Sequence, residues 1–303
     1  MTAVRVKTTG LAIEVEDTGA DGSQAGRPVV LLVMGLGMQL VAWPPALVDA
    51  LQAEGFRVVR FDNRDIGLSQ HLDHLGVPNL LWESLRHRIG LSVRSPYSLQ
   101  DMAADAIGVL DALGIARAHV VGVSMGGMIA QRMALAAPHR VLSLASVMSS
   151  SGARHLPGPK PEVLRVFLGR PEGHGEDAIV DHYVRLFRVI GSPAFPLDEA
   201  ALRERVLLAT RRSFHPAGTA RQMMAVVADS RRADELRRIE VPTLVVHGKS
   251  DPLVPVACGH DTARRIARSQ FVAIEGMGHD LPPQVVQMLL RVLVPHIHAS
   301  ASA

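Results

Sequence analysis

Short, continuously apolar runs recur along this chain and form its strongest pattern. They occupy residues 28–34, 56–61, 119–123, 141–148, 241–246 and 271–274. Runs that are hydrophobic on both faces are typical of buried strands in a parallel sheet. Residues 4–16 instead alternate apolar and polar positions on either side of Thr9 and Gly10, which predicts an antiparallel hairpin ahead of the parallel strands.

Helical patterns separate the apolar runs. The clearest covers residues 99–113, where apolar positions keep a period of ~3.6 residues. Ser98 and Asp101 form a capping-box start, and Gly114 supplies a stop. Further helices are predicted at residues 40–54, 125–137, 259–268 and 283–296. Strand alternating with helix indicates an α/β fold with a doubly wound, mostly parallel sheet.

One stretch, residues 149–240, interrupts this alternation. It contains helical patterns at residues 178–190, 199–212 and 218–227 but no convincing strand, and Pro242 follows its end. We interpret it as a helical cap inserted into a core made of residues 1–148 and 241–303. Such a cap would lie over the strand ends, where open α/β sheets bind their ligands.

Composition limits the possible partners. The formal charge of +3 on 303 residues is too small to indicate a nucleic-acid partner. The single cysteine, Cys258, excludes an internal disulfide framework and fits a reducing compartment. Residues 1–10 lack the apolar core of a secretory signal, and no run approaches the ~20 apolar residues of a membrane helix. We expect a soluble, cytoplasmic protein with no membrane partner, whose oligomeric state the sequence leaves open.

The most informative segment is Gly122-Val123-Ser124-Met125-Gly126, which joins an apolar strand to a helix. A serine hydroxyl is a poor nucleophile, so a catalytic serine must be exposed, aligned with a base and close to oxyanion donors. A sharp strand-to-helix turn provides this, and glycines at 122 and 126 avoid a clash of Cβ atoms in the bend. The segment therefore predicts a nucleophile at Ser124.

With this motif, the chain resembles the serine esterases of the α/β-hydrolase family over essentially its whole length, and residues 149–240 stand where that family has its cap. The family's triad order is serine, then an acid, then histidine. Here Asp251 follows the predicted strand at 241–246, and His279 follows the one at 271–274. The resemblance implies that His279 takes the proton of Ser124, that Asp251 orients the imidazole, and that an acyl-enzyme forms and is hydrolysed.

The resemblance also implies an oxyanion hole made by the backbone N–H groups of Leu36 and Met125. The loop that carries Leu36 starts with Met34 where the family more often has histidine, which resembles a subgroup containing a methylesterase of anthracycline polyketides. An apolar acyl pocket, with core packing as the equal alternative, is predicted from Met34, Gly35, Gly37, Met38 and Leu253.

Other chemistries find little support. Residues 62–69 are interpreted as a structural turn with a salt bridge of Arg64. The histidine pairs 71/74 and 296/298 lack the accompanying ligands of a metal site, so we interpret them as solvated and expect no metal. No glycine-rich nucleotide motif follows the first parallel strand, and nothing demands a cofactor.

The leading hypothesis is therefore an esterase acting on a small-molecule carboxylic ester. An acyltransferase or perhydrolase, or a hydrolase of carbon–carbon bonds, would use the same triad. A ligand sensor with slow turnover is the alternative from another class. Dehalogenases and epoxide hydrolases are disfavoured because they use an aspartate where this chain has Ser124.

Overall fold

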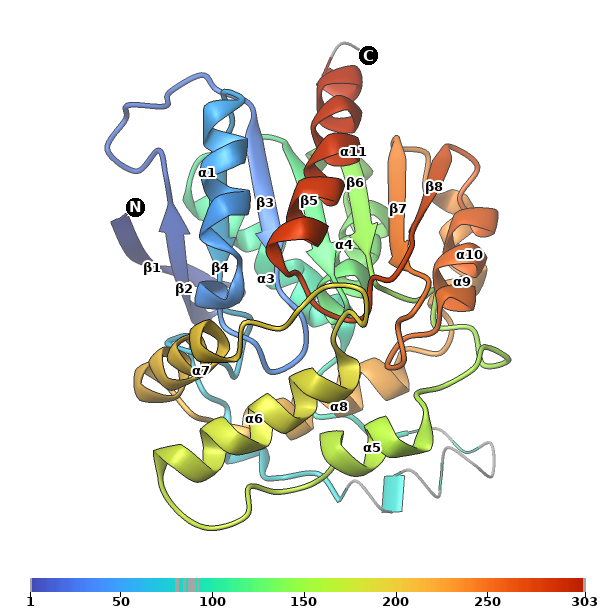
Figure 1. Ribbon diagram of the computed structural model, residues 1–303. Helices are drawn as coiled ribbons and strands as arrows, with labels where there is room; N and C mark the ends of the chain where they lie inside the picture. Colours follow the sequence, from blue (N-terminus) through green and yellow to red (C-terminus); the bar gives the residue numbers. More distant parts are fainter. Residues whose placement is uncertain (1, 80–81, 84–85, 87–90, 92, 302–303) are drawn as a thin grey trace.

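The computed structural model describes residues 2–79, 82–83, 86, 91 and 93–301, and within them one eight-stranded sheet forms the centre of the molecule (Figure 1). The strand order is β1-β2-β4-β3-β5-β6-β7-β8. The strands are β1 (Thr2–Thr8), β2 (Leu11–Asp17), β3 (Val29–Val33), β4 (Arg57–Phe61), β5 (Ala118–Val123), β6 (Val141–Val147), β7 (Thr243–Gly248) and β8 (Ser269–Ile274). The β1–β2 and β2–β4 pairs are antiparallel, and all others are parallel. The doubly wound, mostly parallel sheet predicted from the sequence is confirmed.

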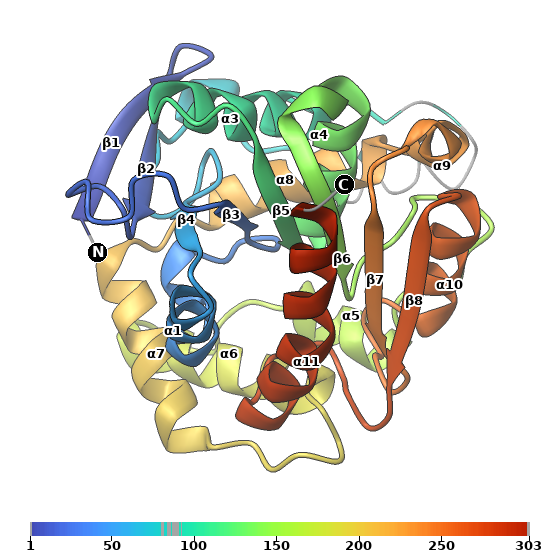
Figure 2. The same ribbon diagram turned by 90° about the horizontal axis from the view of Figure 1, so that it is seen from above.

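Helices cover both faces of the sheet, as Figure 2 shows. One face carries α3 (Leu99–Ala112) and α4 (Met125–Ala136), and the other carries α1 (Pro45–Ala53) and α11 (Pro283–Ala301). The central strand β5 contributes to the hydrophobic clusters on both faces of the sheet. Val120 packs into the cluster on one face, and Val121 packs into the cluster on the other. Burial on both faces is why this strand reads as a continuous apolar run. No helix in the described part of the chain combines the length and apolarity needed to cross a membrane.

Prolines shift the starts of two helices and one strand away from the predicted positions. The helix predicted at 40–54 is split into η1 (Leu40–Ala42) and α1, which begins at Pro45. The helix predicted at 259–268 is α10 (Val256–Arg265), which begins directly after Pro255. Strand β7 starts at Thr243 rather than at 241, because Pro242 has no N–H to give to the sheet.

The predicted helix at 99–113 has the start that its sequence indicates. The Ser98 hydroxyl accepts a hydrogen bond from the backbone N–H of Asp101 at 3.1 Å, and the Asp101 carboxylate accepts one from the N–H of Ser98 at 2.8 Å. Gly114 follows the last turn with φ of 65°. This reciprocal capping box satisfies two of the otherwise unpaired N–H groups of the helix.

The helices between β6 and β7 gather at one end of the sheet (Figure 1). They are α5 (Pro161–Phe167), α6 (Glu176–Ile190), α7 (Glu199–Arg212) and α8 (Pro216–Ala228), whereas the short α9 (Arg232–Glu235) lies beside α10. Val180 and Val184 of α6 pack against Leu202 and Val206 of α7 in a small cluster of their own. Farther along, Leu236 belongs to the main core cluster. The division into a core of 1–148 and 241–303 and a cap of 149–240 stays a prediction.

Candidate active site

Ser124 occupies a sharp turn between β5 and α4, with φ of 55° and ψ of −122°. A side chain rarely adopts this backbone conformation, which is strained. A Cβ at Gly122 would lie 2.2 Å from the carbonyl oxygen of Gly126, and a Cβ at Gly126 would lie 2.0 Å from the carbonyl oxygen of Val33. The two glycines of the motif are therefore what allows the bend that exposes Ser124.

His279 connects Ser124 to Asp251. Its Nε2 lies 3.0 Å from Oγ of Ser124, and its Nδ1 lies 2.7 Å from Oδ2 of Asp251. A carboxylate only accepts hydrogen bonds, so Nδ1 carries the proton and Nε2 accepts from the serine hydroxyl. The three residues, which follow β5, β7 and β8, converge because parallel strands end at the same edge of the sheet.

The carboxylate of Asp251 is fixed from its other side. Its Oδ1 accepts the backbone N–H groups of Leu253 at 2.9 Å and Val254 at 2.8 Å. A second histidine, His247, lies behind it and contacts the carbonyl oxygen of Val254 through Nε2 at 2.7 Å. Burial lowers the pKa of His247, which keeps that ring neutral. With Oδ1 held by the backbone, Oδ2 of Asp251 points toward Nδ1 of His279.

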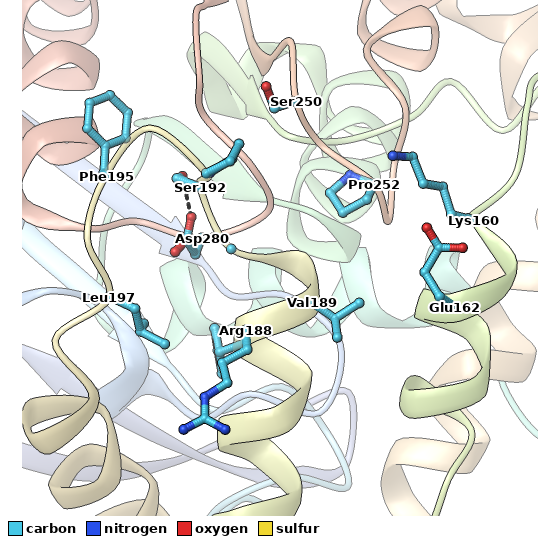
Figure 3. A pocket seen from close by; sticks show the side chains of 13 residues that line it. Lys160, Glu162, Arg188, Val189, Ser192, Phe195, Leu197, Ser250, Pro252 and Asp280 are labelled. Carbon is cyan, nitrogen blue, oxygen red and sulfur yellow. Dashed lines mark hydrogen bonds between the residues drawn. The ribbon is translucent and has the colours of Figure 1, made fainter.

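The end of α6 holds the loop that carries His279. The N–H of His279 donates to the carbonyl oxygen of Ile190 at 2.7 Å, and the N–H of Gly278 donates to Oγ of Ser192 at 2.9 Å. Oγ of Ser192 in turn donates to Oδ1 of Asp280 at 2.5 Å, and Figure 3 shows these two side chains facing each other. Burial raises the pKa of Asp280. Residues 190–192 carry no motif, so nothing in the sequence indicates these contacts.

The loop that carries Leu36 runs beside Ser124. A Cβ at Gly35 would lie 3.2 Å from the Cβ of Ser124. The side chain of Asn63 donates to the carbonyl oxygen of Met34 at 3.0 Å, and Gln222 accepts the N–H of Gly37 at 2.9 Å. Neither the N–H of Leu36 nor that of Met125 has a hydrogen-bond partner among the described residues. Both donors are therefore available to a ligand.

A cavity of about 1000 Å³ lies between these loops and the helices that follow β6. Ser124 and His279 line it, and so does every residue of the predicted oxyanion hole and acyl pocket: Met34, Gly35, Leu36, Gly37, Met38, Met125 and Leu253. The helices between β6 and β7 contribute mainly apolar side chains, among them Leu186, Phe187, Leu202 and Met224. Because the wall is largely apolar, the cavity suits an apolar ligand.

A smaller cavity of about 360 Å³ lies beside it, and Figure 3 shows the residues around it. Asp280 lines both cavities. The contact between Ser192 and Asp280 therefore belongs to the wall between a surface pocket and the site of Ser124.

Residues 62–69, which follow β4, form the structural turn with a salt bridge of Arg64 that the sequence predicts. Arg64 and Asp105 form an ion pair at 2.5 Å. Asp62 accepts the N–H groups of Leu40 at 2.7 Å and Leu68 at 2.9 Å. Arg64 thus ties the segment to α3, and Asp62 ties it to the start of η1.

The histidines at 71 and 74 are both exposed, as predicted. The ring of His71 also stacks on that of His215, with centroids 3.8 Å apart. Asp73 reaches the same histidine, His215, which lies 142 residues farther along the chain. Such a long-range grouping leaves no local signal in the sequence.

Comparison with known proteins agrees with this architecture. A family model described as the alpha/beta hydrolase fold matches residues 28–283. Two rhodomycin D methylesterases resemble the chain over 92% of its length and 93% of theirs, with 31% identity for the protein of Streptomyces sp. strain C5 and 30% for that of Streptomyces peucetius.

Solved structures share the fold at lower identity. The enol-lactonase of Burkholderia xenovorans LB400 has a TM-score of 0.70 at 22% identity, with 97% of this chain and 100% of that chain covered. The S103A variant of a meta-cleavage product hydrolase from Pseudomonas fluorescens IP01 has a TM-score of 0.71 at 19% identity, with 99% and 98% covered. From the family match, the methylesterase relatives and the shared fold, the chain belongs to the α/β-hydrolase family.

Proposed function

We propose that this protein is a serine hydrolase of carboxylic esters, with Ser124 as the nucleophile, His279 as the general base and Asp251 as the orienting acid. The observation that carries the proposal is the unbroken hydrogen-bond chain from Asp251 through His279 to Ser124. The names of the methylesterase relatives, at about 30% identity over almost the whole chain, support an ester substrate.

In the proposed reaction, Nε2 of His279 takes the proton from Oγ of Ser124 as Oγ attacks the ester carbonyl carbon. Negative charge then develops on the carbonyl oxygen, and the free N–H groups of Leu36 and Met125 stabilise it. Each such donor is worth about 2.7–4 kcal/mol in the transition state. The tetrahedral intermediate collapses, His279 returns the proton to the leaving alcohol, and an acyl-enzyme remains. Water, activated by His279, hydrolyses the acyl-enzyme to the acid.

The size and lining of the cavity favour a bulky apolar substrate. About 1000 Å³ lies at the upper end of the ~300–1,000 Å³ range of small-molecule sites. A short ester would leave most of this apolar wall in contact with water. We therefore infer that the substrate has a large apolar part. The names of the methylesterase relatives favour a methyl ester, which places the large apolar part on the acyl side.

The test is ester hydrolysis by the wild type, Ser124→Ala and a matched serine control, Ser150→Ala. Ser150 lines the same cavity but makes no hydrogen bond to His279. p-Nitrophenyl esters of graded acyl length and methyl esters of bulky aromatic acids serve as substrates. We expect Ser124→Ala to lose up to ~10⁶-fold in kcat, while Ser150→Ala stays within about tenfold of the wild type. Equal rates in the wild type and Ser124→Ala would overturn the assignment.

Labelling with a fluorophosphonate separates the nucleophile from the choice of substrate. We expect the reagent to modify the wild type at Ser124 and to leave Ser124→Ala unmodified. Labelling together with a burst of product and negligible turnover would favour the slow sensor over the esterase. Turnover that requires an added alcohol or peroxide would favour the acyltransferase or perhydrolase, and cleavage of a ring-fission product but of no ester would favour the carbon–carbon hydrolase.

A further inference from the structure

Gln222 of α8 contacts the loop that carries Leu36. Its Oε1 accepts the N–H of Gly37 at 2.9 Å, and its Nε2 donates to the carbonyl oxygen of Arg64 at 2.9 Å. The side chain is 0% exposed. Only this orientation of the amide group gives each of its ends a partner, because Gly37 offers a donor and Arg64 an acceptor. Gln222 is therefore fixed between the loop and the segment after β4.

The loop itself turns at Leu36 and Gly37. The N–H of Met38 donates to the carbonyl oxygen of Gly35 at 3.3 Å, and Gly37 has φ of 69° whereas φ of Leu36 is not positive. This combination is typical of a type II turn. A type I turn differs mainly in the orientation of its central peptide group, which here carries the N–H of Gly37. Because Gln222 binds that N–H, it holds the turn in the form described.

The N–H of Leu36 belongs to the neighbouring peptide group. The carbonyl of that group, on Gly35, accepts the hydrogen bond that closes the turn. On the other side, the carbonyl oxygen of Met34 accepts a hydrogen bond from Asn63 at 3.0 Å. The direction of the N–H of Leu36 is therefore set by Asn63 from the segment after β4 and by Gln222 from α8.

Helix α8 lies against both this turn and the large cavity. A Cβ at Gly37 would lie 3.0 Å from the side chain of Thr219, which precedes Gln222 by three residues and so shares its face of the helix. Thr219 also lines the large cavity, together with Met223 and Met224 of the same helix. One helix thus contacts the space proposed for the substrate and the turn that carries the oxyanion donor.

We propose that Gln222 is a positioning residue of the oxyanion hole, which holds the N–H of Leu36 toward the reacting carbonyl oxygen. The inference rests on the proposed esterase reaction, in which that N–H stabilises the developing negative charge. Such a donor acts at about 2.7–3.1 Å from the charged oxygen, so a small rotation of its peptide group weakens it. Loss of Gln222 would release the N–H of Gly37 and let the turn change its form.

The test compares Gln222→Met with Gln222→Glu. Methionine is unbranched and about as long, but it removes both hydrogen bonds. A neutral glutamic acid keeps both, because its carbonyl oxygen accepts and its hydroxyl donates, and burial favours this neutral form. Gln131→Met is the matched control. Gln131 is also 0% exposed and is bonded to Ser146 and Arg232, but it lies outside the lining of the large cavity.

Two rates are measured for each variant, with circular dichroism as a check of folding. The first is steady-state hydrolysis of the p-nitrophenyl ester that the wild type cleaves fastest. The second is labelling of Ser124 by a fluorophosphonate, in which negative charge develops on a phosphonyl oxygen close to the oxyanion donors. The labelling rate therefore reports on the oxyanion hole without depending on the choice of ester.

We expect Gln222→Met to lose ~10²-fold in kcat, with KM within about threefold of the wild type, and to be labelled more slowly by a similar factor. Gln222→Glu should recover most of both rates. Gln131→Met should keep both rates within about threefold, although it also leaves buried polar groups without partners. If Gln222→Met does not fold, Gln222→Asn replaces it with the same expectation, because its shorter side chain cannot reach both partners.

Normal labelling and turnover by Gln222→Met would overturn the inference alone and leave the proposed function intact. Equal losses in Gln222→Met and Gln131→Met would also overturn it, since the effect would then be one of stability. Absence of labelling at Ser124 in the wild type would instead contradict the proposed function, and this inference with it.

Discussion

Oγ of Ser192 donates a hydrogen bond at 2.5 Å to Oδ1 of Asp280, the residue directly after His279. The same oxygen accepts the N–H of Gly278, the residue directly before His279. One hydroxyl from the end of α6 thus holds both neighbours of the histidine. The segment between β6 and β7 therefore helps to position the residue that contacts Ser124.

Replacing Ser192 by alanine should lower kcat while KM changes little. The loop of His279 loses a donor and an acceptor together, and a displacement of about 1 Å at a reacting group can cost ~10²-fold in rate. The N–H of Gly278, which then lacks an acceptor, should also lower the free energy of unfolding by about 1–3 kcal/mol. Steady-state kinetics and urea unfolding measure the two effects.

Ser192→Thr provides the control, since it keeps the hydroxyl and should recover most of kcat. An alanine variant with unchanged kcat, or a threonine variant as slow as alanine, would show that Ser192 has no part in positioning the histidine.

Asp251→Asn should reduce kcat by about 10⁴-fold. The N–H groups of Leu253 and Val254 require an oxygen at the position of Oδ1, so the asparagine NH₂ must face His279. Nδ1 then accepts, Nε2 carries the proton, and the ring can no longer take a proton from Ser124. Ester hydrolysis with circular dichroism as a check of folding measures the loss.

Asp280→Asn is the matched substitution, because Asp280 is a half-buried carboxylate directly after His279 that binds Ser192 instead of Nδ1. We expect it to retain activity within about tenfold. Similar losses in both variants would mean that the tautomer of His279 does not limit the rate.

Gly126→Ala should lower the free energy of unfolding by about 3 kcal/mol and abolish hydrolysis. The added Cβ would lie 2.0 Å from the carbonyl oxygen of Val33, and both atoms belong to backbone that cannot move independently. Gly158→Ala serves as the control, because a Cβ there meets nothing within 4 Å. Denaturant unfolding should show a lower free energy of unfolding for Gly126→Ala than for Gly158→Ala. Equal stability of the two variants would contradict the close approach of α4 to β3.

Acid should destabilise the protein partly through His119. Burial lowers its pKa from 6.5 to about 4, and its Nε2 has no hydrogen-bond partner in the part of the chain that the structure describes. As pH falls from 6.5 to 4, the unfolded chain therefore takes up a proton that the folded chain does not. At ~1.4 kcal/mol per pKa unit, the stability lost by pH 4 approaches about 3 kcal/mol.

His119→Phe should flatten this dependence of unfolding free energy on pH, whereas substitution of the exposed His139 by phenylalanine should leave it unchanged. Denaturant unfolding at several pH values between 4 and 7 measures the slopes. Parallel curves for the wild type and His119→Phe would show that another group accounts for the acid sensitivity.

The sequence predicts the features of this molecule that depend on neighbouring residues. All six apolar runs are strands, and the turn at Ser124 follows from glycines two residues on either side. The sequence misses contacts between distant segments. Gln222 holds Gly37 across 185 residues, and Ser192 holds Gly278 across 86. Such pairs depend on how the helices between β6 and β7 pack, which no local pattern specifies.

The ends of helices are also predicted poorly from the sequence, and prolines account for the differences. The helical period continues through Pro44 and Pro45, but α1 begins only at the second proline, where a missing N–H does no harm. Pro295, in contrast, lies inside α11, which continues to Ala301 beyond its predicted end. The period alone therefore does not say whether a proline starts, stops or sits within a helix.

The backbone of Ser124 has a consequence for how such a sequence can change. Its left-handed φ of 55° costs about 1–3 kcal/mol, and glycine alone would relieve most of that cost. Stability by itself thus favours loss of the serine. Without selection for catalysis, replacement of Ser124 by glycine would make the fold more stable. Serine retained at this position in related sequences would therefore indicate that the catalytic function is still under selection.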